Sequence, residues 1–426
     1  MKKILFTLFA FAVYKIATYI HIPLINPETI NQFFEDADGG IIGMANALTG
    51  NALKNYSIIA LGIGPYITAS IVVQLLQMDI VPLLKEWQEE GDVGKQKINQ
   101  LTRYLAIALA FIQALAMTYG FRLTNNNIFD IGLNPEDITF LTYTYLAIIM
   151  TAGTAFLLWL SDQITNKGIG NGTSMIIVAG IVSTMPGMIK SLTEEYITAE
   201  GSDLGSYGIF ALVMLLYVFI IFFVTVMQSA SRKIPIQYSN RPTGQKFQGR
   251  QDSNIPLKIN SAGVIPVIFA VTLISIPTTI MNFVPDVANS TLGTWLTEMF
   301  SYQRPLGYVL YVGLIFVFAF FYAFVQINPE KIAKNLQNQN AYVPGVRPGI
   351  DTENYISRLL FKITVIGASY LVLIASLPIF ASMIFGLPSY VQIGGTSLLI
   401  VVGVAIETTK QIKTQTQDQK YSGFIK

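Results

Sequence analysis

The sequence contains no cysteine, and His21 is the single histidine among its 426 residues. The absence of cysteine excludes disulfides, thiolate metal sites and cysteine nucleophiles. One histidine cannot supply the several imidazole ligands that many protein zinc sites use. The nucleotide-binding motif G-x-x-x-x-G-K-[ST] is also missing, which excludes a P-loop. We therefore expect no enzyme, no cofactor and no metal site.

Charged residues are scarce as well. Asp, Glu, Lys and Arg make up 12% of the chain, whereas hydrophobic residues make up 52%, and the mean hydropathy is +0.51. Soluble proteins carry about 25% charged residues, which they need to cover their surface. The composition therefore predicts a protein that crosses a membrane several times.

Ten segments are long and apolar enough to cross a bilayer, which requires about 20 largely apolar residues per helix. They lie at roughly 4–20, 57–78, 102–121, 138–160, 172–190, 207–228, 260–282, 306–326, 363–384 and 395–409. We therefore predict an all-α polytopic membrane protein with ten transmembrane helices.

The basic residues indicate how these helices are oriented. If the N-terminus is cytoplasmic, only four of the 27 Lys and Arg residues fall in outer loops: Lys54, Arg122, Lys190 and Arg304. Lys15 lies within the first segment, and the remainder face the cytoplasm. This bias follows the positive-inside rule. It predicts ten spans with both termini in the cytoplasm.

The segment 39–53, with the sequence GGIIGMANALTGNAL, is moderately apolar and rich in glycine. It is too short to cross the membrane, so we expect it to enter part of the way and return. Such a segment is tolerated where protein or a watery cavity shields its polar backbone. An ordinary outer loop with an interfacial helix is the alternative.

Two sequence frames occur twice, each time five spans apart. The frame G-x-x-P-x-I-x-A occurs at 62–69 and at 263–270, and the frame G-T-S-x-x-I-V-x-G occurs at 172–180 and at 395–403. Because five spans is an odd number, a duplicated half must be inserted with the opposite orientation. The repeats therefore predict two inverted five-helix halves, at 1–195 and 196–426.

The repeats also pair isoleucines between the halves: Ile67 with Ile268, and Ile177 with Ile400. Transporters and channels built from inverted repeats place their working site at the interface of the two halves. We expect these four side chains to converge near the middle of the membrane, where an apolar ring closes a path by excluding water. Periodicity alone favours ordinary helix packing.

Two cytoplasmic loops, about 229–259 and 327–362, are long and basic. Long loops are usually functional or disordered. An arginine, Arg347, stands in the Pro- and Gly-rich sequence AYVPGVRPG at 341–349. Exposed positive charge suits docking to an acidic protein surface or to RNA phosphate.

Several long motifs resemble the SecY/Sec61-alpha family. They include ALGIGPYITASIVVQLL (60–76), GKQKINQLTRYLA (94–106), GIGNGTSMIIVAGIV (168–182), PLKINSAGVIPVIFA (256–270) and AYVPGVRPG (341–349). The resemblance implies a channel subunit of the bacterial plasma membrane with a central pore between the two halves. It would translocate unfolded secretory proteins and release membrane-protein helices sideways into lipid.

The resemblance also implies which residues carry these roles. The pore ring would consist of Ile63, Ile67, Thr173, Ile177, Ile268 and Ile400, although family members usually have an apolar residue in place of Thr173. The plug that closes the outer funnel would span 39–53 and include Gly39, Gly40, Ile41, Ile42, Gly43 and Met44. The lateral gate would use Thr68, Gln74 and Asn260. Cytoplasmic docking would use Arg241, Lys246, Arg250 and Arg347.

The partners implied by the resemblance are SecE-like and SecG-like membrane subunits, the SecA motor ATPase and the ribosome, whose RNA and proteins the loops would contact. Signal peptides, nascent chains and membrane lipid complete the set. The alternative function is an inverted-repeat secondary transporter of a small solute. A transporter usually needs ionisable residues in mid-span, and such residues are scarce here.

Overall fold

The structure is a computed structural model of the 426-residue chain. It describes residues 2–25, 46–77, 81–124, 140–198, 204–238, 253–283, 291–301, 304–387 and 389–422. Every structural statement below concerns these residues.

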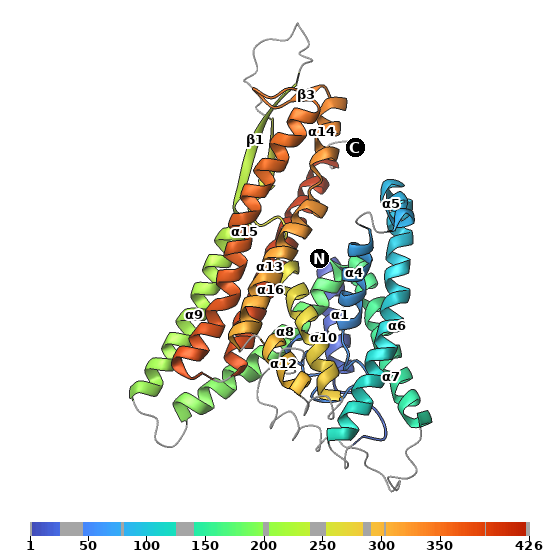
Figure 1. The fold of residues 1–426 in the computed structure, drawn as a ribbon, viewed down its shortest axis with the longest axis vertical. Helices are drawn as coiled ribbons and strands as arrows, with labels where there is room; N and C mark the ends of the chain where they lie inside the picture. Colours follow the sequence, from blue (N-terminus) through green and yellow to red (C-terminus); the bar gives the residue numbers. More distant parts are fainter. Residues whose placement is uncertain are drawn as a thin grey trace.

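Ten helices correspond to the ten predicted spans (Figure 1). They are α1 (Lys2–Ala17), α4 (Gly64–Leu76), α6 (Asp92–Thr124), α7 (Phe140–Lys167), α8 (Gly172–Thr193), α9 (Leu204–Ser229), α10 (Ile265–Phe283), α13 (Pro305–Gln326), α15 (Ile350–Phe385) and α16 (Ser389–Ser422). In the described part of the chain, six helices are long and apolar enough to cross a membrane unaided, and α4 is apolar but shorter. The prediction of a helical, multi-pass membrane protein is confirmed.

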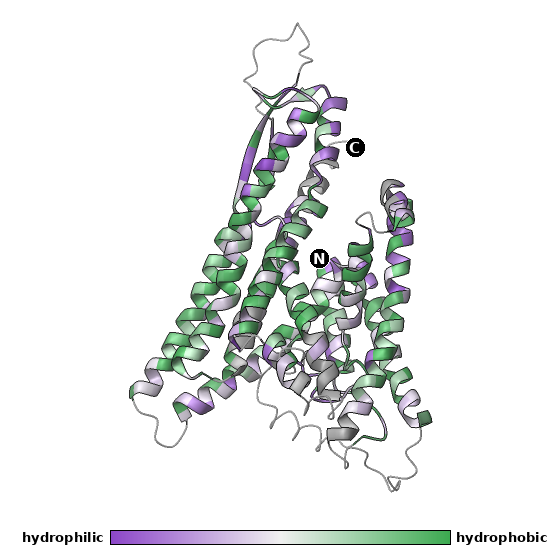
Figure 2. Ribbon diagram, viewed as in Figure 1, coloured by the Kyte–Doolittle hydropathy of each residue, from purple (hydrophilic) through white to green (hydrophobic). Residues whose placement is uncertain are grey.

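Shorter elements connect these helices. They are α5 (Pro82–Glu89), the π-helical turn η1 (Glu194–Thr198), α12 (Thr291–Phe300) and α14 (Pro329–Asn338), and the strands β1 (Ser231–Tyr238), β2 (Ser253–Lys258) and β3 (Ala341–Tyr342). Figure 2 shows apolar residues along the long helices and polar residues at the end that carries β1, β3 and α14.

Helix packing repeats in two groups of five. In the first group α4 packs on α6, α6 on α7, α7 on α8, and α1 on both α7 and α8. In the second group α10 packs on α13, α13 on α15, α15 on α16, and α9 on both α15 and α16. Each helix of the second group therefore has neighbours equivalent to those of the helix five spans earlier in the chain. This pattern supports the division into two five-helix halves.

The first repeated sequence frame produces the same backbone start in both halves. Gly62 and Gly263 adopt φ angles of +57° and +66°, values that favour glycine. A proline then follows in the first turn of α4 and of α10, where it costs no hydrogen bond. The amides of Ile67 and Ile268 donate to the carbonyls of the residues four positions earlier, at 3.1 and 3.4 Å.

The second predicted span differs from the expectation at its start. Residues 57–63 form turns, and helix α4 begins only at Gly64. Several backbone groups in and next to these turns are hydrogen-bonded, as a non-helical segment inside a membrane requires. Ile22 N–H donates to Tyr56 O at 3.1 Å, and Ile58 N–H donates to Ile20 O at 3.0 Å. Hydropathy did not reveal this because apolar turns and apolar helices have the same composition.

The two long loops form a folded extension. Strands β1 and β2 pair antiparallel with Ile234 opposite Ile255, and β3 pairs with the other edge of β1. Helix α15 begins at Ile350, 13 residues before the predicted span. Apolar side chains of both loops and of α15 form one buried cluster: Ile234, Ile236, Leu257, Leu336, Ala341, Val343, Ile356, Leu359 and Ile363. The described parts of 229–259 and 327–362, which were predicted as long loops, therefore contain β1, β2, α14, β3 and the start of α15.

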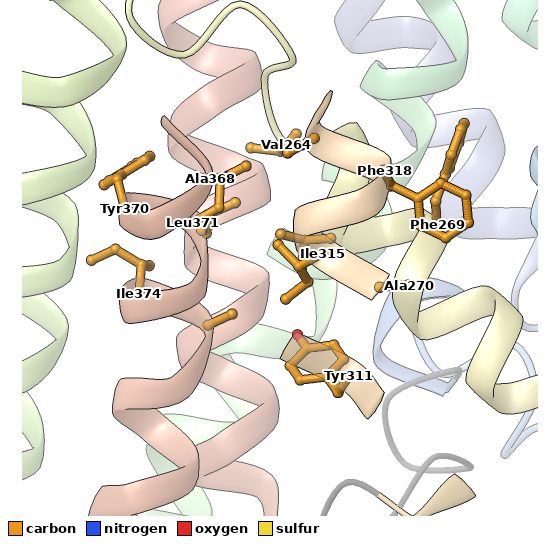
Figure 3. Close-up of a cluster of buried hydrophobic side chains, with 14 of the residues drawn as sticks. Val264, Phe269, Ala270, Tyr311, Ile315, Phe318, Ala368, Tyr370, Leu371 and Ile374 are labelled. Atoms are coloured by element: carbon orange, nitrogen blue, oxygen red, sulfur yellow. The ribbon is translucent and has the colours of Figure 1, made fainter. Parts of the chain in front are cut away.

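The largest core lies among α10, α13 and α15, and Figure 3 shows part of it, with Phe269 and Ala270 from α10, Ile315 from α13 and Leu371 from α15. The two halves meet at several places, of which two involve helices that carry the repeated frames. Helix α10 packs against α4 and α6, and α16 packs against α8. Both contacts involve a helix that carries one of the repeated frames.

Candidate pore constriction and gate

Three of the predicted ring residues lie in one apolar cluster between the halves. Ile177 of α8, Ile268 of α10 and Ile400 of α16 pack around the buried Ile181 and Val404. Ile400 is 1% exposed. Three different helices supply these side chains, and two of the helices belong to the second half.

The other two ring isoleucines lie at the start of α4. Ile63 is buried with Ile59 and Ile176 in a cluster of the first half. Ile67 packs against that cluster and also against the large core of the second half. Ile268 likewise belongs to the edge of both the second-half core and the Ile400 cluster. Ile67 and Ile268, equivalent in the repeat, therefore link the apolar clusters that meet between the halves.

Thr173 is held in a cap at the start of α8. Its backbone N–H and its hydroxyl both donate to Asn171 Oδ1, at 3.2 and 2.6 Å. An Asn side chain commonly accepts such a bond at a helix N-terminus. The hydroxyl of Thr173 is thus satisfied locally, and the side chain is half-buried.

Thr68 and Gln74 lie on α4, whereas Asn260 lies in the turn between β2 and α10, and the three predicted gate residues do not hydrogen-bond to one another. Thr68 Oγ1 donates to Gly64 O at 3.2 Å, and Gln74 Nε2 donates to Ser70 Oγ at 3.1 Å, both inside α4. Asn260 is 4% exposed and lies against α15, where a Cβ added to Gly367 would be 3.6 Å from the Asn260 Cα. Asn260 Nδ2 and Gln74 Oε1 are buried without a hydrogen-bond partner among the described residues.

Several predicted residues lie outside the described part of the chain. They are the plug residues Gly39, Gly40, Ile41, Ile42, Gly43 and Met44, and the docking residues Arg241, Lys246 and Arg250. Arg347 is described and exposed. Its carbonyl accepts a hydrogen bond from Thr352 Oγ1 at 2.8 Å. Gly345 and Gly349, which flank it, have φ angles of +83° and +104°, so the turn that presents Arg347 requires glycine at both positions.

One ion pair joins two membrane helices beside the gate and was not predicted. Arg103 of α6 and Asp162 of α7 lie 2.7 Å apart, and both charges act electrostatically on Tyr66 of α4. Tyr66 precedes Ile67 in the chain and packs in the same first-half cluster. Counting charges by side of the membrane could not reveal this pair because its partners are 59 residues apart.

We expect the Arg103–Asp162 pair to contribute modestly to stability. The two side chains are 46% and 34% exposed, and partly exposed pairs contribute about 0.2–1 kcal/mol. A double-mutant cycle of Arg103→Gln and Asp162→Asn, measured by thermal unfolding in nanodiscs, should give a coupling in this range. Lys95 and Asp92, which are 71% and 94% exposed, are the control and should give a smaller coupling. A smaller value for Arg103–Asp162 than for the control would contradict the prediction.

A profile of the SecY family matches residues 57–409. The protein translocase subunit SecY of Staphylococcus epidermidis is 46% identical over 427 residues, which cover 99% of this chain and 96% of that protein. A solved protein-conducting channel superposes with a TM-score of 0.64 at 18% identity, over 97% of this chain and 92% of that one. Sec61 in a canine ribosome–channel complex from the endoplasmic reticulum gives 0.60 at 17%, with the same coverage.

The fold is therefore that of the protein-conducting channels, a class of multi-pass membrane proteins. Within that class, the chain belongs to the SecY family. The resemblance seen in the sequence motifs is confirmed. The prediction that the chain is not an enzyme is also confirmed, because its relative is a translocase subunit. The alternative, a small-solute transporter, receives no support from these relatives.

Proposed function

We propose that the chain is the pore subunit of a bacterial protein translocase in the plasma membrane, with both termini in the cytoplasm. It moves unfolded secretory proteins through a pore between its halves and releases apolar helices sideways into lipid. One observation carries this proposal. The paired isoleucines Ile67 and Ile268, with Ile177 and Ile400, lie in apolar clusters that meet where the two halves contact each other.

This arrangement suits a seal around a changing cargo. Apolar contacts are non-directional and grow with the area that is covered, so short branched side chains can surround any polypeptide. Without cargo the same side chains close on one another and exclude water, which blocks ions. A polar or charged ring would instead select particular solutes. The six predicted ring residues include five isoleucines.

The contact between α4 and α10 suits a sideways exit. Helix α4, with 13 residues, is short for a membrane span, and α10 packs against α4 and α6 of the other half. Apolar surface gains about 25 cal/mol per Å² on leaving water, which drives a sufficiently apolar helix into lipid. Gln74 Oε1 and Asn260 Nδ2, which are buried without a partner among the described residues, destabilise the shut arrangement, because a buried polar atom without a partner costs about 1–3 kcal/mol.

The folded cytoplasmic extension suits a docking platform for the ribosome or for the SecA motor. It is rigid enough to transmit force because its hydrophobic core joins β1, β2 and α14 directly to α15. Arg347 is exposed on it, in a turn with two glycines of positive φ. SecE-like and SecG-like subunits, signal peptides, nascent chains and lipid complete the proposed partners. The fold similarity to Sec61 in a ribosome complex supports this proposal.

Site-specific crosslinking tests the proposal directly, because the chain has no cysteine of its own. Ile268→Cys and Ile400→Cys should each form a disulfide with a single cysteine in a polypeptide stalled during translocation. Leu215→Cys on α9, at a residue that is 70% exposed, is the control and should not. A stalled chain that reacts equally at Leu215, or at none of the three, would refute the proposed pore.

A further inference from the structure

The segment 46–52 lies between the halves, on the side of the membrane where α1 ends. Ala47 is buried and packs against Met188 of α8 and Val271 of α10. Helix α8 belongs to the first half and α10 to the second. A contact of this kind closes the space between the halves only while the segment is held in place.

Hydrogen bonds make this segment a compact unit. Asn46 Nδ2 donates to Asn51 Oδ1 at 3.0 Å, and Thr49 Oγ1 donates to Asn46 O at 3.0 Å. The backbone N–H of Lys54 donates to Asn46 Oδ1 at 2.9 Å. Gly50 and Asn51 both have φ angles of +68°. The unit is therefore well ordered internally, and its position depends on what attaches it to the helices.

Tyr14 of α1 provides a polar attachment. Its hydroxyl donates to Thr49 O at 2.7 Å, and the side chain is 2% exposed. Thr49 is itself buried, so this hydrogen bond takes the place of one that its carbonyl would otherwise make with water. In the next residue of α1, Lys15 Nζ donates to Ser183 Oγ of α8, which fixes α1 against α8 at the same level.

Two glycines allow the segment to approach α8 closely. A Cβ on Gly180 would lie 2.4 Å from Leu48 O and 3.0 Å from the Tyr14 hydroxyl oxygen. A Cβ on Gly50 would lie 3.0 Å from Gly180 Cα. Backbone touches backbone at this crossing, and the Tyr14 hydroxyl sits beside both glycines. A loss of the Tyr14 bond therefore releases the segment at its tightest contact.

We propose that Tyr14 is a positioning residue for the resting seal. Its hydroxyl latches the segment 46–52 onto α1 and α8, and the latch holds Ala47 against α8 and α10 when no polypeptide occupies the pore. This inference rests on the proposed channel function, and it assigns to Tyr14 the holding of residues 46–52, the described part of the plug predicted at 39–53. The latch acts through the position of the segment and touches no cargo.

The test compares two removals of a buried tyrosine hydroxyl in the complete translocase, reconstituted with its partner subunits in a planar bilayer. Tyr14→Phe removes the bonded hydroxyl. Tyr370→Phe is the control, because its hydroxyl is buried without a partner among the described residues. Tyr14→Phe should raise the ion leak of the substrate-free channel by about tenfold, the change that one lost buried hydrogen bond supports. Tyr370→Phe should leave the leak unchanged.

Two further measurements separate the latch from a general loss of stability. The extra leak should disappear when a stalled polypeptide fills the pore, and the thermal midpoint of Tyr14→Phe should lie only slightly below that of Tyr370→Phe, because the first variant loses one hydrogen bond and the second loses none. A much lower midpoint with a leak that persists in the filled pore would indicate damaged folding and overturn the latch. An unchanged resting leak would also overturn it.

A second pair of variants approaches the same crossing from α8. Gly180→Ala forces the segment away and should leak like Tyr14→Phe, whereas Gly187→Ala, on the same helix with open space around its Cβ, should not. If Gly180→Ala fails to fold, Tyr14→Phe remains decisive. If Ile268→Asn leaks and Tyr14→Phe does not, the Tyr14 latch is wrong but the isoleucine seal stands. If neither variant leaks, the proposed seal is wrong as well.

Discussion

Replacement of Ile268 by asparagine is expected to make the resting channel leak ions and to let it export precursors with defective signal sequences. Ile268 packs against Ile400 and Ile177 on one side and against the second-half core on the other. Burial of an isoleucine side chain contributes about 2 kcal/mol, and asparagine forfeits it while attracting water into the constriction. A loss of this size shifts the equilibrium between closed and open channels by roughly thirtyfold.

Bilayer conductance and an export assay measure the two effects of Ile268→Asn in parallel. Ile350→Asn is the matched control, since Ile350 is 76% exposed at the start of α15. It makes the same chemical change away from the pore and should alter neither result. If Ile268→Asn has the same ion leak and the same export selectivity as the unaltered protein, Ile268 does not contribute to the seal.

The constriction could be approached from the sequence because the duplicated frames carry backbone information. In both copies of the first frame a glycine with positive φ and a proline in the first helical turn specify how α4 and α10 begin. The isoleucine that follows the proline by two residues must then occupy equivalent places in the two halves. Ile67 and Ile268 do so, and each packs at the edge of two apolar clusters. The repeated backbone geometry was enough to predict that these two side chains occupy equivalent places in the two halves.

The folded extension formed by β1, β2, β3, α14 and the start of α15 was not predicted, for a different physical reason. Its core is built from short apolar stretches, such as Ile234 and Ile236 alternating along β1, that become buried only when Leu257, Leu336 and Ile356 come together from distant positions. A window of about 20 residues averages such alternation with the basic residues between. Alternation of apolar and polar residues along β1 was the signal that a strand would form, but this stretch was too short to be recognised within a window of that length.

The tertiary contacts of single residues were invisible for a similar reason. The Arg103–Asp162 pair depends on how α6 and α7 cross, and the Tyr14–Thr49 bond depends on turns within 46–63 that replace the predicted helix start. Asn260 was expected at the gate by resemblance alone, and it packs beside Gly367 of α15. Sequence patterns predict which faces are apolar, whereas these contacts follow from the distances between helices.

Glycines that bring backbones into contact lead to the prediction with the largest effect on stability. Gly153 of α7 faces the turn that precedes α4, and a Cβ at this position would lie 2.0 Å from Ile58 O. Ordinary contact begins near 3.4 Å, so Gly153→Ala must push the carbonyl away by more than 1 Å. That carbonyl belongs to the residue whose N–H is bonded to Ile20 O. The shift should therefore disturb the paired backbone that lets the turns at 57–63 exist inside a membrane.

Gly153→Ala is expected to destabilise the protein by about 3 kcal/mol or more, the upper end of overpacking costs. Gly313→Ala in α13 is the matched control, because its Cβ would meet nothing within 4 Å. Alanine is a better helix former than glycine by about 1 kcal/mol, so the control should be neutral or slightly stabilising. Thermal unfolding in the same nanodiscs should give shifts of opposite sign for the two variants. Equal shifts would mean that α7 has room to move away from the turn, and the close approach at Gly153 would then be no requirement of the fold.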